Sequence, residues 1–84
     1  MDLTIAEFEK NSRECVRISL REFKGAKLLD VRILAVSANA ANKFAPTAKG
    51  VSVRIDLLRT LRDALEAADR EGVALDWLES EEGR

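Results

Sequence analysis

The sequence predicts an α+β fold, in which a four-stranded antiparallel sheet is followed by one C-terminal amphipathic helix. Two observations carry this prediction. Apolar and polar residues alternate between positions 15 and 55, which is the period of half-buried strands, and apolar residues then recur every three or four positions, which is the period of a helix. The 84 residues allow one domain, and so short a chain buries so little surface that a dimer is expected.

The alternation predicts four strands. The first two cover residues 15–23 and 28–36, and Gly25 between them supplies the backbone freedom of a hairpin turn. A short third strand is expected over residues 44–47, at an edge or a bulge because its proline cannot donate to a sheet ladder. The fourth strand covers residues 51–55, where valine and isoleucine alternate with serine and arginine.

The remaining segments follow from the change of period and from local composition. The helix is expected over residues 55–71, with the glycine after it as terminator, and the small polar residues 37–43 are typical of a loop. Residues 1–11 mix apolar and acidic positions without a sustained period and are interpreted as an N-terminal arm. Residues 73–84 form an apolar coda and an acidic tail, which leaves residues 12–72 as the expected domain.

The composition argues against several kinds of site. The chain has no histidine and no tyrosine, and its one cysteine, Cys15, lies on a predicted strand, so a Cys–His nucleophile and a Cys/His zinc site are impossible. Glycine-rich loops that cradle nucleotides are absent. We therefore expect no enzymatic activity, no metal and no cofactor. The single cysteine and the lack of a long apolar run or signal-like start favour a cytoplasmic protein without a membrane partner.

The net charge of −1 hides an uneven distribution of charged residues. Residues 10–54 carry ten basic side chains against three acidic ones, whereas residues 55–84 carry four against nine and residues 1–9 carry three acids alone. A nearly neutral protein can therefore present one strongly positive face, which is typical of partners with a negative backbone.

Seven basic residues are candidates for that face. Three arginines point away from the apolar stripe of the predicted strands and four lysines lie in the flanking segments: Arg17, Arg21, Arg32, Lys24, Lys27, Lys43 and Lys49. A single outward arginine usually serves solubility and discourages edge-to-edge pairing of sheets. Several of them on adjacent strands favour a groove that follows the backbone of a nucleic-acid single strand.

Two phenylalanines are candidates for stacking on bases. Phe23 continues the outward parity of Arg17 and Arg21, which favours exposure, and a core position is the alternative. Phe44 follows a lysine and is a second candidate that could equally cap the core. Trp77 lies among acidic residues and is interpreted as a packing anchor for the tail or a dimer contact.

Two segments together resemble a known family. ISLREFKGAKLLDVR at 18–32 and PTAKGVSV at 46–53 resemble the DNA-binding core of the transcriptional coactivator family known as positive cofactor four, and IAEFEKNSRE at 5–14 is similar to its bacterial branch. The resemblance covers about residues 12–70. It implies a curved four-stranded antiparallel sheet with a helix across its back, a homodimer, and sequence-independent binding of single-stranded or melted DNA.

The resemblance also implies which residues touch DNA. By position it assigns this role to Arg21, Phe23, Lys24, Arg32 and Lys49. The chain departs from the family at Ala26, where a lysine is frequent, and at residues 33–35, where aromatic residues are usual, including a base-stacking tryptophan. We therefore expect weaker binding than is usual in the family.

Two further functions compete with a dimeric single-strand binder that acts in transcription or on the nucleoid of a bacterium. One is a protein-interaction module, in which the dimer and its acidic tail recruit the transcription machinery and nucleic-acid binding is weak. The other is RNA binding, because the same basic and aromatic surface suits an unpaired RNA strand.

Overall fold

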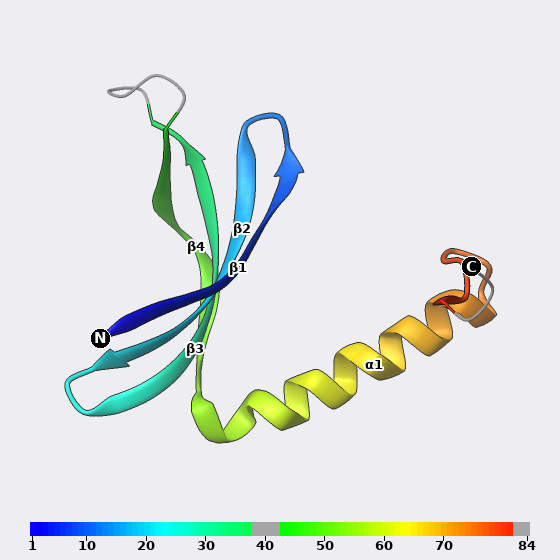
Figure 1. Cartoon of the computed structure of the whole chain (residues 1–84). Coiled ribbons are helices and arrows are strands. Elements are labelled where there is room, and N and C mark those ends of the chain that lie inside the picture. Colours follow the sequence, from blue (N-terminus) through cyan, green and yellow to red (C-terminus); the bar gives the residue numbers. More distant parts are fainter. Residues whose placement is uncertain (38–42, 82–84) are drawn as a thin grey trace.

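The computed structural model describes residues 1–37 and 43–81, so residues 38–42 of the predicted loop and 82–84 of the predicted tail lie outside the described residues. The elements, in chain order, are β1 (Asp2–Asn11), β2 (Glu14–Phe23), β3 (Ala26–Val36), β4 (Phe44–Arg54), the 3-10 turn η1 (Ile55–Leu57) and α1 (Leu58–Ala74). The four strands form one antiparallel sheet in the order β1-β2-β3-β4, and the helix follows it (Figure 1). The predicted α+β fold is confirmed.

Strand β1 occupies the segment that the sequence analysis interprets as an arm. It pairs with β2 along its whole length, so the interpretation of residues 1–11 as an arm is wrong. The physical reason is a bulge at Ile5, where the register shifts between Thr4 and Ala6 and the alternation of apolar and polar residues slips by one position. A period counted through the bulge therefore gives no strand signal.

Strand β4 combines the predicted third and fourth strands, which are two halves of one bulged strand. Three of its residues lie opposite Ile33 alone. The Thr47 hydroxyl closes this bulge, because it donates to the Ile33 carbonyl at 2.8 Å and accepts from the Lys49 amide at 3.1 Å. Gly50 ends the bulge at φ +147°, and a Cβ at that position would clash with the carbonyl oxygen of Val31.

Strand register divides the side chains between two faces. The apolar face carries Leu3, Phe8, Val16, Ile18, Leu20, Leu29, Val31, Ile33, Val51 and Val53. The polar face carries Asp2, Thr4, Glu7, Glu9, Cys15, Arg17, Ser19, Arg21, Phe23, Asp30, Arg32, Phe44, Ser52 and Arg54. Four apolar residues share this face, namely Leu28, Val36, Pro46 and the almost fully buried Leu34. This division is the one that the parity of the two central strands predicts.

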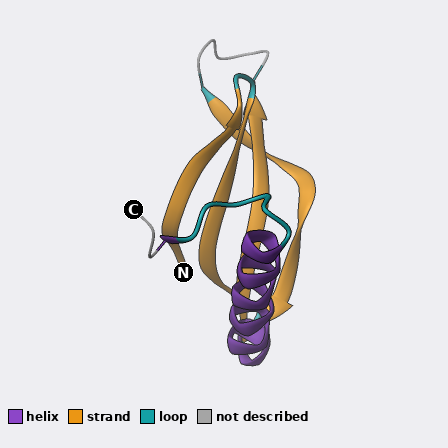
Figure 2. Ribbon diagram, turned by 90° about the vertical axis from the view of Figure 1, so that its right-hand side faces the viewer, coloured by secondary structure: helices purple, strands orange, loops and turns teal. Residues whose placement is uncertain are grey.

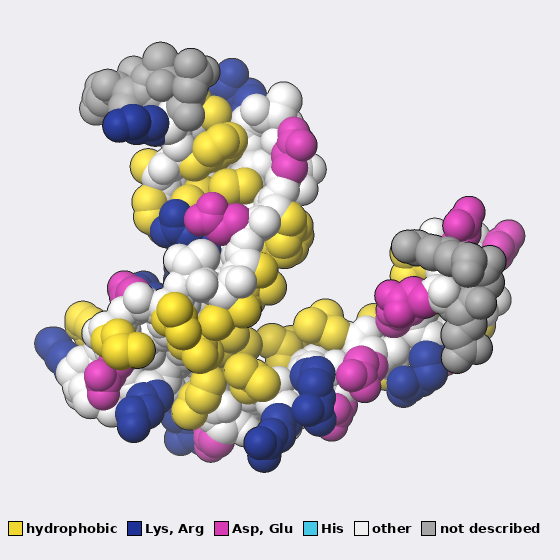
Figure 3. Space-filling model, in the orientation of Figure 1, with side chains coloured by type: hydrophobic (Ala, Val, Ile, Leu, Met, Phe, Trp, Pro, Cys, Tyr) yellow, Lys and Arg dark blue, Asp and Glu magenta, His cyan; other side chains and the backbone are white. Residues whose placement is uncertain are grey.

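Helix α1 projects away from the sheet and does not lie across its back (Figures 1 and 2). Leu58 and Leu61 are half-buried near the sheet, whereas Leu65 is 62% exposed. An open hollow of about 410 Å³ lies between these leucines and the apolar face, and hydrophobic side chains gather at this corner in Figure 3. The expectation of a helix across the back of the sheet is therefore not met within one chain.

The helix also ends later than predicted. It continues past Gly72 to Ala74, and the Gly72 carbonyl then accepts hydrogen bonds from the amides of Trp77 at 2.8 Å and Leu78 at 3.2 Å. Leu78 folds onto Gly72, where a Cβ would lie 2.8 Å from the Leu78 side chain. The glycine leaves room for the Leu78 side chain against this turn, and it does not terminate the helix itself.

The centre of the sheet is a polar row that crosses three strands and is buried at its two members on β2 and β3, Ser19 and Asp30. Ser19, Asp30 and Ser52 lie directly opposite one another on β2, β3 and β4, and only 2% of Asp30 is exposed. The Asp30 carboxylate accepts hydrogen bonds from Arg32 Nη2 at 2.6 Å, from Arg32 Nε at 3.3 Å and from the Ser52 hydroxyl. These bonds, that of Arg32 first, lower the pKa of Asp30 below its ordinary value against the opposing effect of burial.

We expect the Asp30→Asn variant to lower the free energy of unfolding by about 1–3 kcal/mol at neutral pH, because Arg32 loses its charged acceptor. The loss depends on pH in a defined direction. The pKa of Asp30 is lowered in the folded state from a value near 3.8, so its stabilisation is present above that pH and is lost as the pH falls through the folded-state pKa.

Urea denaturation of the wild type and of D30N at neutral pH and at several acidic pH values measures this effect. The difference in unfolding free energy is expected to shrink as the pH falls below about 4. A difference that stays constant across this range would show that the charge of Asp30 contributes nothing to the fold.

Candidate nucleic-acid interface

Two rows of basic residues cross the polar face on either side of the buried Asp30 row. In the first row Arg17 of β2 lies directly opposite Arg32 of β3. In the second row Arg21 lies four residues further along β2, about 13 Å away at the rise of a strand. The sheet therefore holds the three predicted arginines on one face, at two positions along the length of the strands.

Arg17 and Arg21 are each paired with a carboxylate of β1. Arg17 Nε lies 2.9 Å from Glu7 Oε1, and Arg21 Nε lies 3.4 Å from Asp2 Oδ2. Sequence reasoning missed both partners, because it counted the acids of residues 1–9 as a separate acidic end of the chain. Pairing of β1 with β2 brings them onto the polar face and reduces its net positive charge.

The Arg32 side chain is largely buried, and its hydrogen bonds join β3 to β4. Its guanidinium binds Asp30, reaches Ser52 at 3.3 Å and donates from Nη1 to the Ala48 carbonyl at 3.1 Å, and only 19% of its side chain is exposed. The hydrogen bond to Asp30 raises the pKa of Arg32 above its ordinary value. Through Ala48 this arginine holds the bulge that carries Lys49.

The β2–β3 hairpin carries an exposed aromatic ring and a cation next to each other. Phe23 is 58% exposed, which agrees with the exposed alternative that strand parity favours. Lys24 and Gly25 form the two-residue turn with φ values of +52° and +82°. The Lys24 ammonium lies 5.4 Å from the centroid of the Phe23 ring. A side chain with a Cβ rarely adopts this left-handed conformation, so the lysine carries backbone strain at this position.

A second aromatic lies at the far end of the polar face, and two lysines lie near that end of the sheet. Phe44 is 42% exposed and pairs with Val36, whereas Phe23 pairs with Ala26, so the two rings lie at opposite ends of β3, about 33 Å apart along the strand. Lys43 precedes β4 and is exposed. The predicted site residues at this end therefore lie just before β4, at its first position and in its bulge, and the bulge residue Lys49 lies near Glu14, whose parity is that of the apolar face.

Lys49 extends from the bulge with 75% of its side chain exposed, and its ammonium lies 4.0 Å from a Glu14 carboxylate oxygen. Glu14 also binds Asn11 and Lys10, each at 3.0 Å. These hydrogen bonds, that of Asn11 first, lower the pKa of Glu14. The carboxylate therefore stays charged beside Lys49 at neutral pH.

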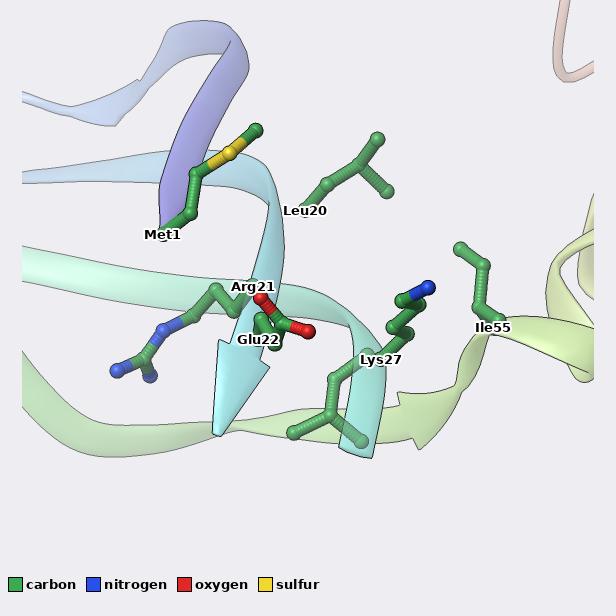
Figure 4. Close-up of a pocket in the computed structure, with 7 residues that line it drawn as sticks. Met1, Leu20, Arg21, Glu22, Lys27 and Ile55 are labelled. Atoms are coloured by element: carbon green, nitrogen blue, oxygen red, sulfur yellow. The ribbon is translucent and has the colours of Figure 1, made fainter. Parts of the chain in front are cut away.

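Lys27 does not join the other predicted residues. It lies within β3 opposite Glu22, and both residues alternate away from Arg21 toward the apolar face. Figure 4 shows the Lys27 amine pointing toward Ile55 and the Arg21 guanidinium pointing to the other side. Its placement in a flanking loop is a consequence of starting the second strand two residues late.

Arg54 belongs to the polar face, although the sequence analysis does not name it as a candidate. It lies opposite Leu28, which in turn lies opposite Arg21, and 75% of its side chain is exposed at 3.3 Å from Asp56. The alternation of residues 51–55 contains the signal, because it places Arg54 on the side away from the valines.

Other kinds of site receive no support from the described part of the chain. Residues 1–37 and 43–81 contain no group of three or more potential metal ligands. Over the same ranges no helix has both the length and the apolarity that a membrane span requires. Cys15 is half-buried and has a free thiol.

The comparisons with known proteins agree with this geometry. Residues 10–64 match the family described as transcriptional coactivator p15 (PC4). The structure resembles a PC4 homologue of Burkholderia pseudomallei in an orthorhombic crystal form, with a TM-score of 0.72, 38% identity, and coverage of 82% of this chain and 90% of that chain. In a tetragonal crystal form the same homologue gives a TM-score of 0.72 and 33% identity over 82% of this chain and 98% of that chain.

A PC4 homologue of bacteriophage T5, implicated in recombination-dependent DNA replication, shares the fold with a TM-score of 0.61 at 23% identity, over 89% of this chain and 81% of that chain. No match was found among curated protein sequences. The family match covers well over half of the chain and includes β2, β3, β4 and the start of α1. The chain therefore belongs to the PC4 family of transcriptional coactivators.

Proposed function

We propose that the polar face binds single-stranded or melted DNA without sequence preference. The observation that carries this proposal is the exposed Phe23 ring beside the Lys24 ammonium, at one end of a face that holds basic side chains along its length and a second exposed ring, Phe44, at the other end. Aromatic rings that stack on unpaired bases and cations that follow the phosphates are the two parts of a single-strand site.

Each group has a separate task in this mechanism. Arg17, Arg21, Lys24, Lys49 and Arg54 attract phosphates, while the two phenylalanines accept bases by stacking, which every base can do. Arg32 contributes indirectly to DNA binding, because its hydrogen bond to the Ala48 carbonyl positions the bulge that carries Lys49. The protein adds no chemical step, and we propose that it is a binding protein and not an enzyme.

We further propose that the functional unit is a homodimer in the cytoplasm. The apolar face and the leucines of α1 are left open by the chain itself, and the hollow between them is lined by Ile18, Leu29, Val31, Leu58, Leu61 and Leu65 among others. A second copy that covers this hollow would bury apolar area that one small chain leaves in water. Both polar faces would remain free for DNA.

The Leu65→Glu variant tests the homodimer. Leu65 is 62% exposed in the single chain, so a charge there costs the monomer little and costs a helix-covered interface much. We expect sedimentation velocity to give the mass of two chains for the wild type and of one chain for L65E. The control is Thr60→Glu, which adds the same charge at an exposed position of the same helix outside the leucine stripe and is expected to stay dimeric. A dimeric L65E would contradict the proposed interface.

DNA binding is measured by fluorescence anisotropy with labelled oligo-dT at several salt concentrations. If five basic side chains contact phosphates, log K is expected to fall against log salt with a slope of about −3 to −4. The Phe23→Ala variant is expected to bind at least about fivefold more weakly, because stacking on one base contributes ~1–3 kcal/mol.

Phe8→Ala is the matched control for this loss, because Phe8 is similarly exposed, at 53%, but lies on the apolar face. With its dimeric state checked, this variant is expected to bind oligo-dT as the wild type does. A flat salt dependence, or equal losses in F23A and F8A, would count against the proposed face.

Lys24 gives a separate prediction, because its strained turn position and its function have opposite requirements. Asparagine accepts the left-handed conformation more readily than lysine, so Lys24→Asn is expected to raise the free energy of unfolding by about 0.5–1 kcal/mol while it weakens oligo-dT binding severalfold. Lys24→Arg retains both charge and strain, and is expected to change neither quantity much. A K24N variant that binds as well as wild type would remove Lys24 from the site.

The acidic segment after α1 favours a second candidate function, recruitment of a protein. Trp77 is 80% exposed on a turn that hydrogen bonds to Gly72 hold in place, with Asp76 and Glu79 beside it. We propose that this exposed aromatic on a hydrogen-bonded turn suits a basic partner such as a component of the transcription machinery. A pull-down that survives nuclease and is lost in Trp77→Ala supports recruitment, and competition between matched DNA and RNA strands decides which nucleic acid the polar face prefers.

A further inference from the structure

We propose that β1 is an internal counter-ion strand: the carboxylates of Glu7 and Asp2 occupy the two arginines of β2, so that a nucleic acid must displace them in order to bind. The strand would thereby set the selectivity of the polar face for single strands. This inference rests on the proposed function, because it names a selectivity determinant of that same site.

The pairing is direct and is built into the sheet register. Glu7 lies opposite Arg17 with 2.9 Å between carboxylate oxygen and Nε, and Asp2 lies opposite Arg21 with 3.4 Å between the corresponding atoms. All four side chains are on the polar face. Both arginines therefore face a carboxylate of the same chain before any ligand arrives.

The bulge at Ile5 is what makes the two pairs possible together. Asp2 and Glu7 are five residues apart, so in a regular strand they would point to opposite faces. The register shift at Ile5 adds one residue to β1 and brings both acids onto the face of Arg17 and Arg21, which are four residues apart. The interruption that hides β1 in the sequence is thus the feature that aligns its acids with the basic residues.

Stability alone gives a weak account of these pairs. The side chains are substantially exposed, with 32% for Arg17, 44% for Glu7, 42% for Arg21 and 59% for Asp2. Exposed ion pairs contribute only about 0–1 kcal/mol to a fold. These ion pairs have a larger effect on the binding of a polyanion. A phosphate that replaces a carboxylate gains less free energy from the arginine, because the existing ion pair has to be broken first.

This competition favours single strands over other polyanions. A ligand that relies on phosphate contacts alone, such as a blunt duplex, loses part of its attraction at both arginines. An unpaired strand also stacks on Phe23, which is 58% exposed and separated from the acids of β1 by Arg21. The acids therefore do not reduce the binding free energy that stacking contributes. Discrimination then comes from a repulsive element as much as from an attractive one.

The Glu7→Gln variant tests the inference against a matched control, Glu9→Gln. Glu9 also lies on the polar side of β1, opposite Cys15, so its replacement removes the same charge without releasing an arginine. We expect E7Q to raise affinity for a blunt duplex about two- to fivefold, which corresponds to the free energy of an exposed ion pair, and to raise oligo-dT affinity less. E9Q is expected to change both by a smaller, equal factor, and both variants should keep the melting temperature of the wild type within a few degrees.

The arginine dependence separates a released arginine from a general charge effect. In an Arg17→Gln background, E7Q is expected to lose its advantage over E9Q, because no guanidinium remains to be released. Equal effects of E7Q and E9Q in wild-type background, with oligo-dT binding intact, would overturn the counter-ion strand and leave the proposed function standing. Absence of any oligo-dT binding by the wild type and E7Q at low salt would overturn both.

Discussion

The rest of the sheet depends on one interaction, the pair of Asp30 and Arg32 at the centre of β3. Two residues of one strand point to the same face when they are two apart, so this pair forms within a single strand and needs no loop to bring it together. The buried carboxylate fixes the guanidinium, the guanidinium binds Ala48 and Ser52 of β4, and the bulge of β4 then carries Lys49 into solvent. A buried carboxylate thus fixes, through Arg32, the position of an exposed basic residue one strand away. The same geometry explains why an arginine that the sequence marks as a DNA contact is largely occupied within the protein.

Parity along the chain predicts the fold as far as the strands are regular. It assigns the side chains of β2 and β3 to the correct faces of the sheet and predicts the Gly25 hairpin. It also favours the exposure of Phe23 that the structure shows. It fails at β1 and β4, and for one reason in both: a bulge inserts residues into one strand only, so the period of two is interrupted. Two of the hydrogen bonds that hold the β4 bulge, from Thr47 to Ile33 and from Arg32 to Ala48, join residues distant in sequence, and no local pattern records them. The fold class was predictable, whereas the two edges of the sheet required the register itself.

The charge of the polar face could not be predicted from the sequence for the same reason. The excess of basic residues over 10–54 is real along the chain, but a face collects residues from strands that are distant in sequence, and β1 adds acids to it. Arg17, Arg21 and Arg32 each have a carboxylate partner, and the more exposed Arg54 and Lys49 also lie near carboxylates, those of Asp56 and Glu14. The face is therefore less positive than the count along the chain indicates. Arg54 could have been found by parity, since it alternates with Val51 and Val53. The partners of Arg17 and Arg21 could not, because the bulge at Ile5 decides on which face they lie.

The two faces of the sheet impose opposite demands on a chain of this size. A polar face that is to meet a nucleic acid has to stay in water, so nearly all apolar cover must be found on the other side, and α1 does not provide it within the chain. If a second copy covers the apolar face, the two polar faces of the dimer both stay open to solvent. One dimer then offers two binding surfaces to the same nucleic acid. A strand long enough to reach both would bind the second with an effective concentration set by its own length, which raises affinity without any new contact. Individually weak faces, whose arginines are already paired, are compatible with useful binding under that arrangement.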